Sequence, residues 1–223
     1  MLNAVYSSAT AQETITYSVL TKDDVEGAVD CISSTFTYGE PMTKLLGISK
    51  KEFDHFAKLF VNKAVTDGLS IVAKDSISGE VIGCLVCEDF ITELPEGIET
   101  ISEKFFPIFG LLEELTNKFK SQNVVAQGEL YHLFMGGVRK EFAGKGIIDE
   151  LTLEAEKLAQ SKNFKGAIGE ATGPISQHVY VNRFGYQPLD VVEYKEFLFE
   201  DAPVFADIQD CEKCQLIIKY FNN

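Results

Sequence analysis

The sequence predicts a mixed α/β (α+β) domain built on a central sheet of about seven strands. Segments with the apolar period of amphipathic helices alternate with shorter β-rich runs along the whole chain. The chain has 223 residues and shows no internal repeat and no change of composition that would mark a second domain. We therefore expect one domain over residues 14–223, preceded by a flexible N-terminus over residues 1–13.

The N-terminal part of this domain is predicted to contain one weak strand, at residues 15–20, and two helices. At each predicted helix start a hydroxyl residue stands three positions before an acid, namely Thr21 before Asp24 and Ser49 before Glu52. This spacing is typical of a capping box. The first helix is expected to end where residues 33–41 break the apolar pattern, and the second to end at Gly68.

A hairpin follows, with strands at residues 69–74 and 81–89 and with Gly79 available for a left-handed turn. Residues 98–119 have helical spacing, and Pro107 is expected to start or kink that helix. The remaining predicted elements are a strand at 130–138, a helix at 147–162, a strand at 164–171, a short helix at 176–183, and strands at 191–199 and 215–221.

The charge balance argues against some partners. The chain has 20 Lys and Arg against 34 Asp and Glu, a formal net charge of -14. Such a field repels phosphate backbones and anionic lipid surfaces, so we expect neither nucleic acid nor a membrane as partner. A cationic small molecule would be attracted, although an acidic surface is also a common route to solubility. No apolar run reaches the roughly 18 residues of a membrane span, and residues 1–14 lack a signal-peptide pattern, which predicts a cytoplasmic protein.

The five cysteines are an odd number in a chain too large to depend on disulfides, which favours reduced thiols. Cys84 and Cys87 lie in a predicted strand, where positions three apart point to opposite faces and cannot chelate one ion. Cys211 and Cys214 have no companion ligand cluster in the sequence. No metal site is therefore expected.

The strongest local signal is a strand, a glycine-containing loop and a long helix over residues 130–162. This order delivers backbone amides to the N-terminus of a helix, where an anion such as a pyrophosphate is favoured. The loop is neither a P-loop nor a full dinucleotide fingerprint, because only Gly144 and Gly146 are present. Alone, the pattern also fits an ordinary tight turn.

Two segments resemble motifs of the GNAT superfamily of N-acetyltransferases. Residues 130–148, LYHLFMGGVRKEFAGKGII, are similar to its motif A, and residues 176–186, SQHVYVNRFGY, are similar to its motif B. The predicted order of elements also matches that fold. The resemblance implies an acyl-CoA N-acyltransferase fold with helices on both faces of a mixed sheet, and acetyl-CoA as cosubstrate without a metal. It implies that the cofactor contacts are made by Phe134, Met135, Gly136, Phe142, Ala143, Gly144, Lys145, Gly146 and Ile147.

Motif A departs from the family pattern at two positions. Ala143 stands where members typically have Gln or Arg, and Ile148 stands where they typically have Gly or Ala. The first change removes a side chain from the pyrophosphate site, and the second adds bulk where the helix approaches the phosphates.

Three residues are candidates for the chemistry. Tyr180 matches the motif B tyrosine that, in many members, protonates the departing thiolate. Glu40 lies in a segment, FTYGEP, that resembles the arylalkylamine N-acetyltransferase branch, where an acidic residue before proline acts as base. His132 is a second candidate base, because histidine titrates in the useful range and a period of two places His132, Phe134 and Gly136 on one face. A core tyrosine, a solvated glutamate and a structural histidine are the alternatives.

The resemblance implies direct transfer of an acetyl group from acetyl-CoA to the primary amine of a small cationic acceptor, of the arylalkylamine or polyamine type. A strand amide near Met135 would polarise the thioester carbonyl. Two alternatives remain open: a non-catalytic acyl-CoA-binding regulatory module, and an N-acetyltransferase acting on peptides or proteins. The expected oligomeric state is a monomer or a homodimer.

Overall fold

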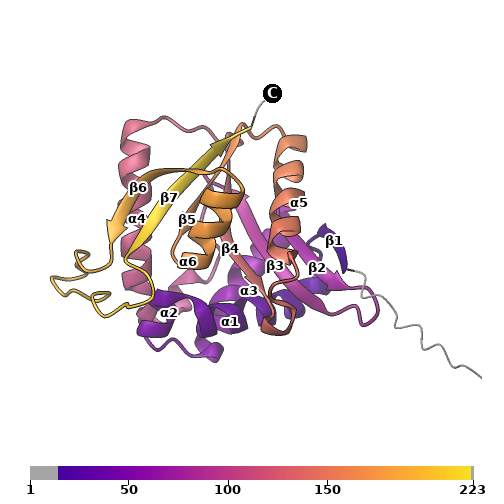
Figure 1. Cartoon of the computed structure of the whole chain (residues 1–223), viewed down its shortest axis with the longest axis horizontal. Helices are drawn as coiled ribbons and strands as arrows, with labels where there is room; N and C mark the ends of the chain where they lie inside the picture. Colours follow the sequence, from indigo (N-terminus) through magenta and orange to yellow (C-terminus); the bar gives the residue numbers. More distant parts are fainter. Residues whose placement is uncertain (1–14, 222–223) are drawn as a thin grey trace, which may run out of the picture.

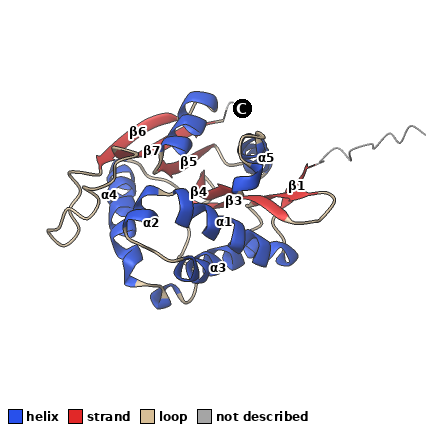
Figure 2. Ribbon diagram, turned by 60° about the horizontal axis from the view of Figure 1, so that its bottom comes forward, coloured by secondary structure: helices blue, strands red, loops and turns tan. Residues whose placement is uncertain are grey.

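The computed structural model describes residues 15–221, and the predicted flexible residues 1–13 lie outside that range. A seven-stranded sheet in the order β1-β2-β3-β4-β5-β7-β6 forms the centre of the molecule (Figure 1). Helices α1, α3 and α4 cover one face of the sheet, and α5 and α6 cover the other (Figure 2). The mixed α/β fold with helices on both faces is confirmed.

The strands are β1 (Ile15–Val19), β2 (Ile71–Asp75), β3 (Val81–Asp89), β4 (Leu130–Val138), β5 (Gly166–Ala171), β6 (Gln187–Glu193) and β7 (Lys213–Tyr220). The helices are α1 (Val25–Gly39), α2 (Pro41–Leu45), α3 (Lys50–Asp67), α4 (Phe106–Gln122), α5 (Ile147–Ser161) and α6 (Pro174–Gln177), the last of which continues as a wider helical turn over His178–Arg183.

Local sequence signals account for most of these boundaries. Both capping boxes form, at Thr21 and at Ser49, and α3 ends at Gly68, whose φ of 63° is left-handed. Gly79 turns the hairpin with a φ of 73°. Pro107 lies in the first turn of α4, so it starts this helix and does not kink it.

Three predicted boundaries are wrong. The helix expected at 98–119 begins only at Phe106, after two short 3-10 helices at Ile98–Thr100 and Glu103–Phe105. Helix α1 does not end near Ser33 but continues to Gly39. Thr35 and Thr37 donate hydrogen bonds to carbonyls one turn earlier, so their hydroxyl groups are satisfied within the helix. The strand expected at 191–199 lies at Gln187–Glu193, and the apolar residues after it pack into a loop around the buried Tyr194 and Phe205.

The parallel pair at the centre of the sheet is incomplete. β4 and β5 are paired from Leu130 opposite Gly166 to Leu133 opposite Gly169, and the pairing stops there. All other neighbouring strands are antiparallel. The C-terminal halves of β4 and β5 are therefore not hydrogen-bonded to each other and leave a gap in the sheet.

A β-bulge shapes β4 at this gap. Val86 of β3 faces Met135, but the next residue, Cys87, faces Leu133, so Phe134 is the extra residue. Phe134 and Met135 consequently lie on the same face, next to α3 and α1, and Gly136 lies on the opposite face beside Tyr180. The prediction that His132, Phe134 and Gly136 share one face is therefore wrong for Gly136.

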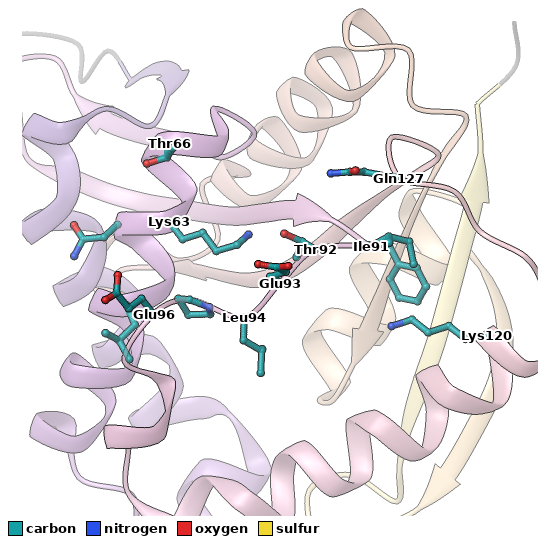
Figure 3. Close-up of a pocket in the computed structure, with 13 residues that line it drawn as sticks. Lys63, Thr66, Ile91, Thr92, Glu93, Leu94, Glu96, Lys120 and Gln127 are labelled. Atoms are coloured by element: carbon teal, nitrogen blue, oxygen red, sulfur yellow. The ribbon is translucent and has the colours of Figure 1, made fainter.

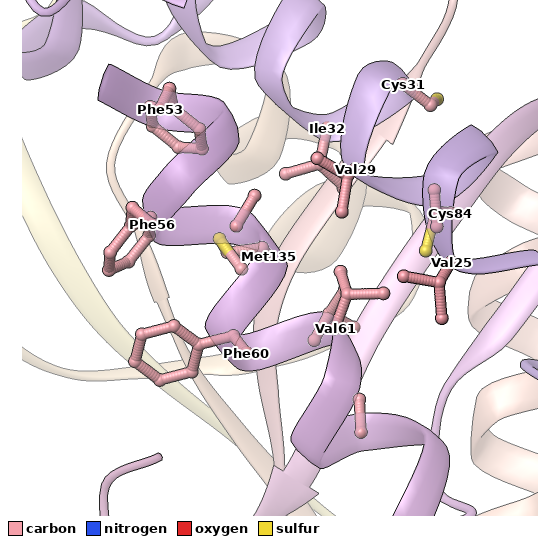
Figure 4. Close-up of a cluster of buried hydrophobic side chains, with 14 of the residues drawn as sticks. Val25, Val29, Cys31, Ile32, Phe53, Phe56, Phe60, Val61, Cys84 and Met135 are labelled. Atoms are coloured by element: carbon pink, nitrogen blue, oxygen red, sulfur yellow. The ribbon is translucent and has the colours of Figure 1, made fainter. Parts of the chain in front are cut away.

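Buried apolar side chains fill both faces of the sheet. Figure 4 shows the cluster between α1, α3 and the sheet, in which Phe53, Phe56 and Phe60 of α3 lie near Met135 of β4. Cys84 belongs to this cluster and Cys87 to the one under α5, which confirms that they face opposite sides. Within residues 15–221, no group of three or more His, Cys, Asp or Glu side chains is arranged to hold a metal ion. None of the helices described is both long and apolar enough to cross a bilayer.

Candidate active site

A narrow cavity of about 50 Å³ lies between α1, α3, α4 and the bulged part of β4. Its wall is mainly aromatic and aliphatic, and its polar members are Glu40, Thr43 and Thr172. The lining side chains are Phe36, Glu40, Met42, Thr43, Phe53, Phe56, Phe105, Ile108, Phe109, Leu112, Phe134, Met135 and Thr172. The only carboxylate among them is Glu40. The cavity thus combines an apolar wall with one acidic group, and at about 50 Å³ it admits an amine with an apolar substituent only if side chains of the wall move.

The backbone holds Glu40 in place. Glu40 is the N-cap of α2, and its two carboxylate oxygens accept hydrogen bonds from the amides of Met42, at 3.2 Å, and Thr43, at 2.6 Å. Pro41 occupies the first helical position, where its missing N–H is not needed. Burial raises the pKa of Glu40 above its usual range, and this effect exceeds the opposing effect of the hydrogen bonds from Thr43, Met42 and Thr172. Glu40 is thus a cap and a cavity-lining carboxylate at once.

His132 is not part of this cavity wall. Its Nε2 donates to Glu170 Oε2 at 2.8 Å, and its Nδ1 donates to Glu88 Oε1 at 3.3 Å. Burial by itself would lower the pKa of His132, but the charges and hydrogen bonds of Glu170 and Glu88 outweigh burial and raise this pKa to about 10. The imidazole is therefore a cation with both nitrogens engaged at neutral pH, which disfavours the role of general base.

Tyr180 lies on the other face of the sheet from Glu40. Its hydroxyl is 3.7 Å from the position that a Cβ on Gly136 would take, beside the gap between β4 and β5. Burial raises the pKa of Tyr180, and a hydrogen bond with Thr152 of α5 opposes this only in part. The phenol therefore stays protonated across the physiological range, as a proton donor must.

The glycine loop forms a strand-to-helix connection at the start of α5. Gly144 and Gly146 have left-handed φ values of 77° and 76°, and Gly146 caps the helix. The amides of Asp149 and Glu150 both donate to the Gly146 carbonyl, at 3.1 and 3.2 Å, so the first turn of α5 closes on the glycine loop. Phe142, Ala143 and Lys145 lie in the same loop, so the predicted residues 142–147 are brought together. Phe134 and Met135 instead present their side chains to the cavity near Glu40.

A larger open cleft of about 930 Å³ lies on the face of the sheet that also holds the Glu40 cavity. It is formed by α3, the segment after β3 and the end of α4 (Figure 3). It contains none of the predicted site residues. Lys63 on its wall donates to Glu88 at 3.2 Å, and Phe90 packs edge-on against the His132 ring. The cleft therefore borders the buried group of Lys63, Glu88, His132 and Glu170.

Sequence reasoning missed the partners of the predicted residues. Thr172, Glu88 and Glu170 were not proposed, although Glu88 and Glu170 are charged residues within apolar strands and this contrast is a usable signal. The phenylalanines of the cavity come from α1, α3, α4 and β4, and only the packing of these elements brings them to one place.

No protein-family model matches the chain. Among solved structures, the C-terminal condensation domain of Ebony in complex with β-alanyl-dopamine superposes with a TM-score of 0.85 at 19% identity, covering 94% of this chain and 100% of that one. Arylalkylamine N-acetyltransferase 2 from Aedes aegypti gives 0.76 at 24% identity, with coverage of 94% and 100%. The polyamine N-acetyltransferase of Drosophila melanogaster gives 0.70 at 16%, with coverage of 93% and 100%. The chain thus shares its fold with these three proteins.

Proposed function

We propose that this protein is an N-acyltransferase that moves an acyl group, acetyl in the simplest case, from a thioester such as acetyl-CoA to the primary amine of a small acceptor. One observation carries the proposal. Glu40, a carboxylate with a raised pKa, is the single acidic group of an apolar cavity that reaches the gap between β4 and β5. The names of the similar structures, which are N-acetyltransferases and an amide-forming condensation domain, support the same bond formation.

The two reacting groups would lie on opposite faces of the gap. The acceptor amine would lie in the cavity beside Glu40, and the thioester sulfur would lie on the opposite face beside Tyr180. Glu40 takes the proton that the ammonium must lose before its nitrogen can attack the thioester carbonyl carbon. The C–N bond then forms, the nitrogen gives its second surplus proton to solvent, and the C–S bond breaks. The Tyr180 hydroxyl protonates the departing thiolate and regains its proton from solvent.

The position of α4 favours a small acceptor. Phe105, Ile108, Phe109 and Leu112 from this region close the cavity on the side away from the sheet. A peptide substrate needs an open groove along which its backbone can lie, and α4 occupies that space. The apolar wall favours an arylalkylamine over a polyamine, because a second ammonium would meet phenylalanine side chains and no second carboxylate of the lining.

The test is the Glu40→Gln variant, assayed for thiol release from acetyl-CoA with a panel of phenethylamines, indoleamines, polyamines and short peptides, and with the products confirmed by mass. We expect turnover with an arylalkylamine and a fall in kcat/KM of roughly 100-fold or more in the variant. Glutamine keeps one capping oxygen, so one of the two bonds from Met42 and Thr43 is lost, at a cost of about 1 kcal/mol in the free energy of unfolding. Glu52→Gln is the matched control, since Glu52 also accepts a bond from a backbone amide but lies outside the cavity. Equal activity in Glu40→Gln and the wild type would exclude Glu40 as the base.

A further inference from the structure

The start of α5 carries its own negative charge. Asp149 and Glu150 lie in the first turn of this helix, at the place where the fold would receive the diphosphate of a nucleotide-bearing donor. Asp149 Oδ2 lies 4.0 Å from the position of a Cβ on Gly146, so the carboxylate bends back toward the glycine loop. It is held there by an ion pair with Arg183. Its other oxygen, Oδ1, is buried and accepts no hydrogen bond from any residue between 15 and 221.

This carboxylate takes over the electrostatic role of a bound phosphate. An acidic side chain in the first turn stabilises the helix through the same N-terminal dipole that would attract an external anion. A diphosphate on the glycine loop would therefore meet a like charge at close range, and it would compete with Asp149 for Arg183.

Ile148 adds bulk beside Tyr180 at the end of β4, and not at the glycine loop. Its Cδ1 lies 3.6 Å from the Cβ position of Gly136, so the side chain lies over the end of β4 beside Tyr180. The bulk predicted at this position is thus directed at the space between α5 and the gap in the sheet. The backbone loop with Gly144 and Gly146 is formed and carries the cation Lys145, but the Asp149 carboxylate lies at its helix end and opposes a diphosphate there.

The gap itself fits the other half of the donor. A pantetheine arm is uncharged and carries two amides, so it can add to the free edges of β4 and β5 as a short strand does, beyond the Leu133 and Gly169 pair. Tyr180 stands beside that path. None of the contacts expected along this part depends on the nucleotide.

We infer that this chain takes its acyl group from the thiol of a pantetheine arm and gains no binding free energy from a nucleotide diphosphate. The inference rests on the proposed function and concerns only its donor. Acetyl-CoA contains the same arm and remains a substrate, but its nucleotide half contributes nothing to affinity. The natural donor is then either a small acyl-pantetheine or an acylated phosphopantetheine arm attached to a carrier protein.

The test is isothermal calorimetry of the full chain with CoA, 4′-phosphopantetheine and pantetheine. We expect the wild type to bind CoA and 4′-phosphopantetheine no more tightly than pantetheine, and up to about tenfold more weakly because Asp149 repels the phosphates. Asp149→Asn should tighten CoA roughly tenfold and leave pantetheine unchanged. Glu154→Gln, an exposed change further along α5, should alter neither affinity. Wild-type CoA binding that is 100-fold tighter than pantetheine binding would overturn the inference, and so would the absence of measurable pantetheine binding. The wild-type comparison requires no variant to fold.

Measurements of turnover distinguish a failure of this inference from a failure of the proposed function. They also show whether the pantetheine arm belongs to a small molecule or to a carrier protein. If the three ligands bind as expected but no thioester is consumed with any amine, the proposed function fails and the inferred binding preference stands. With acetyl-pantetheine and an acetylated carrier protein as donors, a tenfold higher kcat/KM for the carrier indicates a protein-bound arm. Equal values indicate a small-molecule donor. Either result supports recognition of the arm alone.

Discussion

At the scale of single residues, His132 shows how neighbouring charges decide what a titratable group can do. Its strand position and its ordinary pKa of 6.5 make it a plausible base, but Glu88 and Glu170 hold it as a cation. Glu170 Oε1 is buried and has no hydrogen-bond partner among residues 15–221, so the imidazolium is the main compensation for that carboxylate. His132 is therefore better placed to stabilise the sheet beside the gap than to take protons from an acceptor.

This arrangement predicts a pH-dependent stability. The folded-state pKa of His132, about 10, lies above its ordinary value of 6.5. Its contribution is therefore fully present below pH 6.5 and is lost as the pH rises toward 10. His132→Asn should lower the free energy of unfolding by about 3 kcal/mol near pH 6, because two buried carboxylates lose their shared partner. Urea unfolding at a series of pH values measures the difference, which should shrink above neutrality. His55→Asn, at an exposed histidine bonded to Thr100, is the control, and a pH-independent difference would contradict the prediction.

Glu40 predicts the pH dependence of the reaction. Because burial raises its pKa, the acid limb of kcat/KM should lie above the ordinary glutamate value of 4.5. The limb should disappear in Glu40→Gln and persist in His132→Asn. The same raised pKa means that the Glu40 contribution to stability is present below pH 4.5 and is lost as the pH rises through the folded-state pKa. A limb at or below 4.5, or one that survives in Glu40→Gln, would assign the titration to another group.

At the scale of elements, the site depends on where helices begin and where strands are interrupted. The sequence contains clear signals for the former, since the capping boxes, Pro107 and Gly68 all act where they were predicted to act. It does not place the bulge at Phe134, because LYHLFMGGV is mostly apolar, a strand buried on both faces shows no period of two, and its glycines lie two residues further on. Glu40 and Tyr180 were therefore found from local motifs, but their placement on opposite faces of the gap required the three-dimensional structure.

The N-terminus of α3 provides a prediction at this scale, because this helix supplies Phe53 and Phe56 to the cavity. Ser49 Oγ accepts from the amide of Glu52, and Glu52 accepts in return from the Ser49 amide. Ser49→Ala should lower the free energy of unfolding by about 1 kcal/mol. Ser121→Ala, at the exposed C-terminal end of α4, is the control and should change it by less than about 0.5 kcal/mol. Equal effects of the two variants in thermal or urea unfolding would show that the capping box contributes no stability.

The capping box also has a pH signature. Its hydrogen bonds with Ser49, together with that of Lys104, lower the pKa of Glu52 to about 2. The contribution of Glu52 to stability is therefore present above pH 4.5 and is lost as the pH falls toward 2. The stability contribution of Glu40 changes with pH in the opposite direction. Acid unfolding of Glu52→Gln and Glu40→Gln should therefore show opposite changes in the pH dependence of stability.

At the scale of the whole molecule, the net charge of -14 acts on both substrates with opposite sign. It draws a cationic amine toward the protein and repels the phosphates of a nucleotide-bearing donor. Raising the salt concentration from about 20 mM to about 500 mM screens both effects. We expect kcat/KM for a cationic acceptor to fall severalfold over this range, measured with acetyl-pantetheine as an uncharged donor.

The same salt series distinguishes acceptor attraction from a general effect of salt on the enzyme. With acetyl-CoA as the varied substrate at saturating amine, the KM for the donor should fall as salt rises, because screening weakens the repulsion of its phosphates by Asp149, Glu150 and the acidic surface. With acetyl-pantetheine as the varied substrate, it should stay constant. A KM that rises with salt for the amine and falls with salt for acetyl-CoA would follow only if charge acts on each substrate separately. The same change of KM with salt for the amine, acetyl-CoA and acetyl-pantetheine would mean that salt changes the protein. The acidic surface would then have no role in selecting the acceptor.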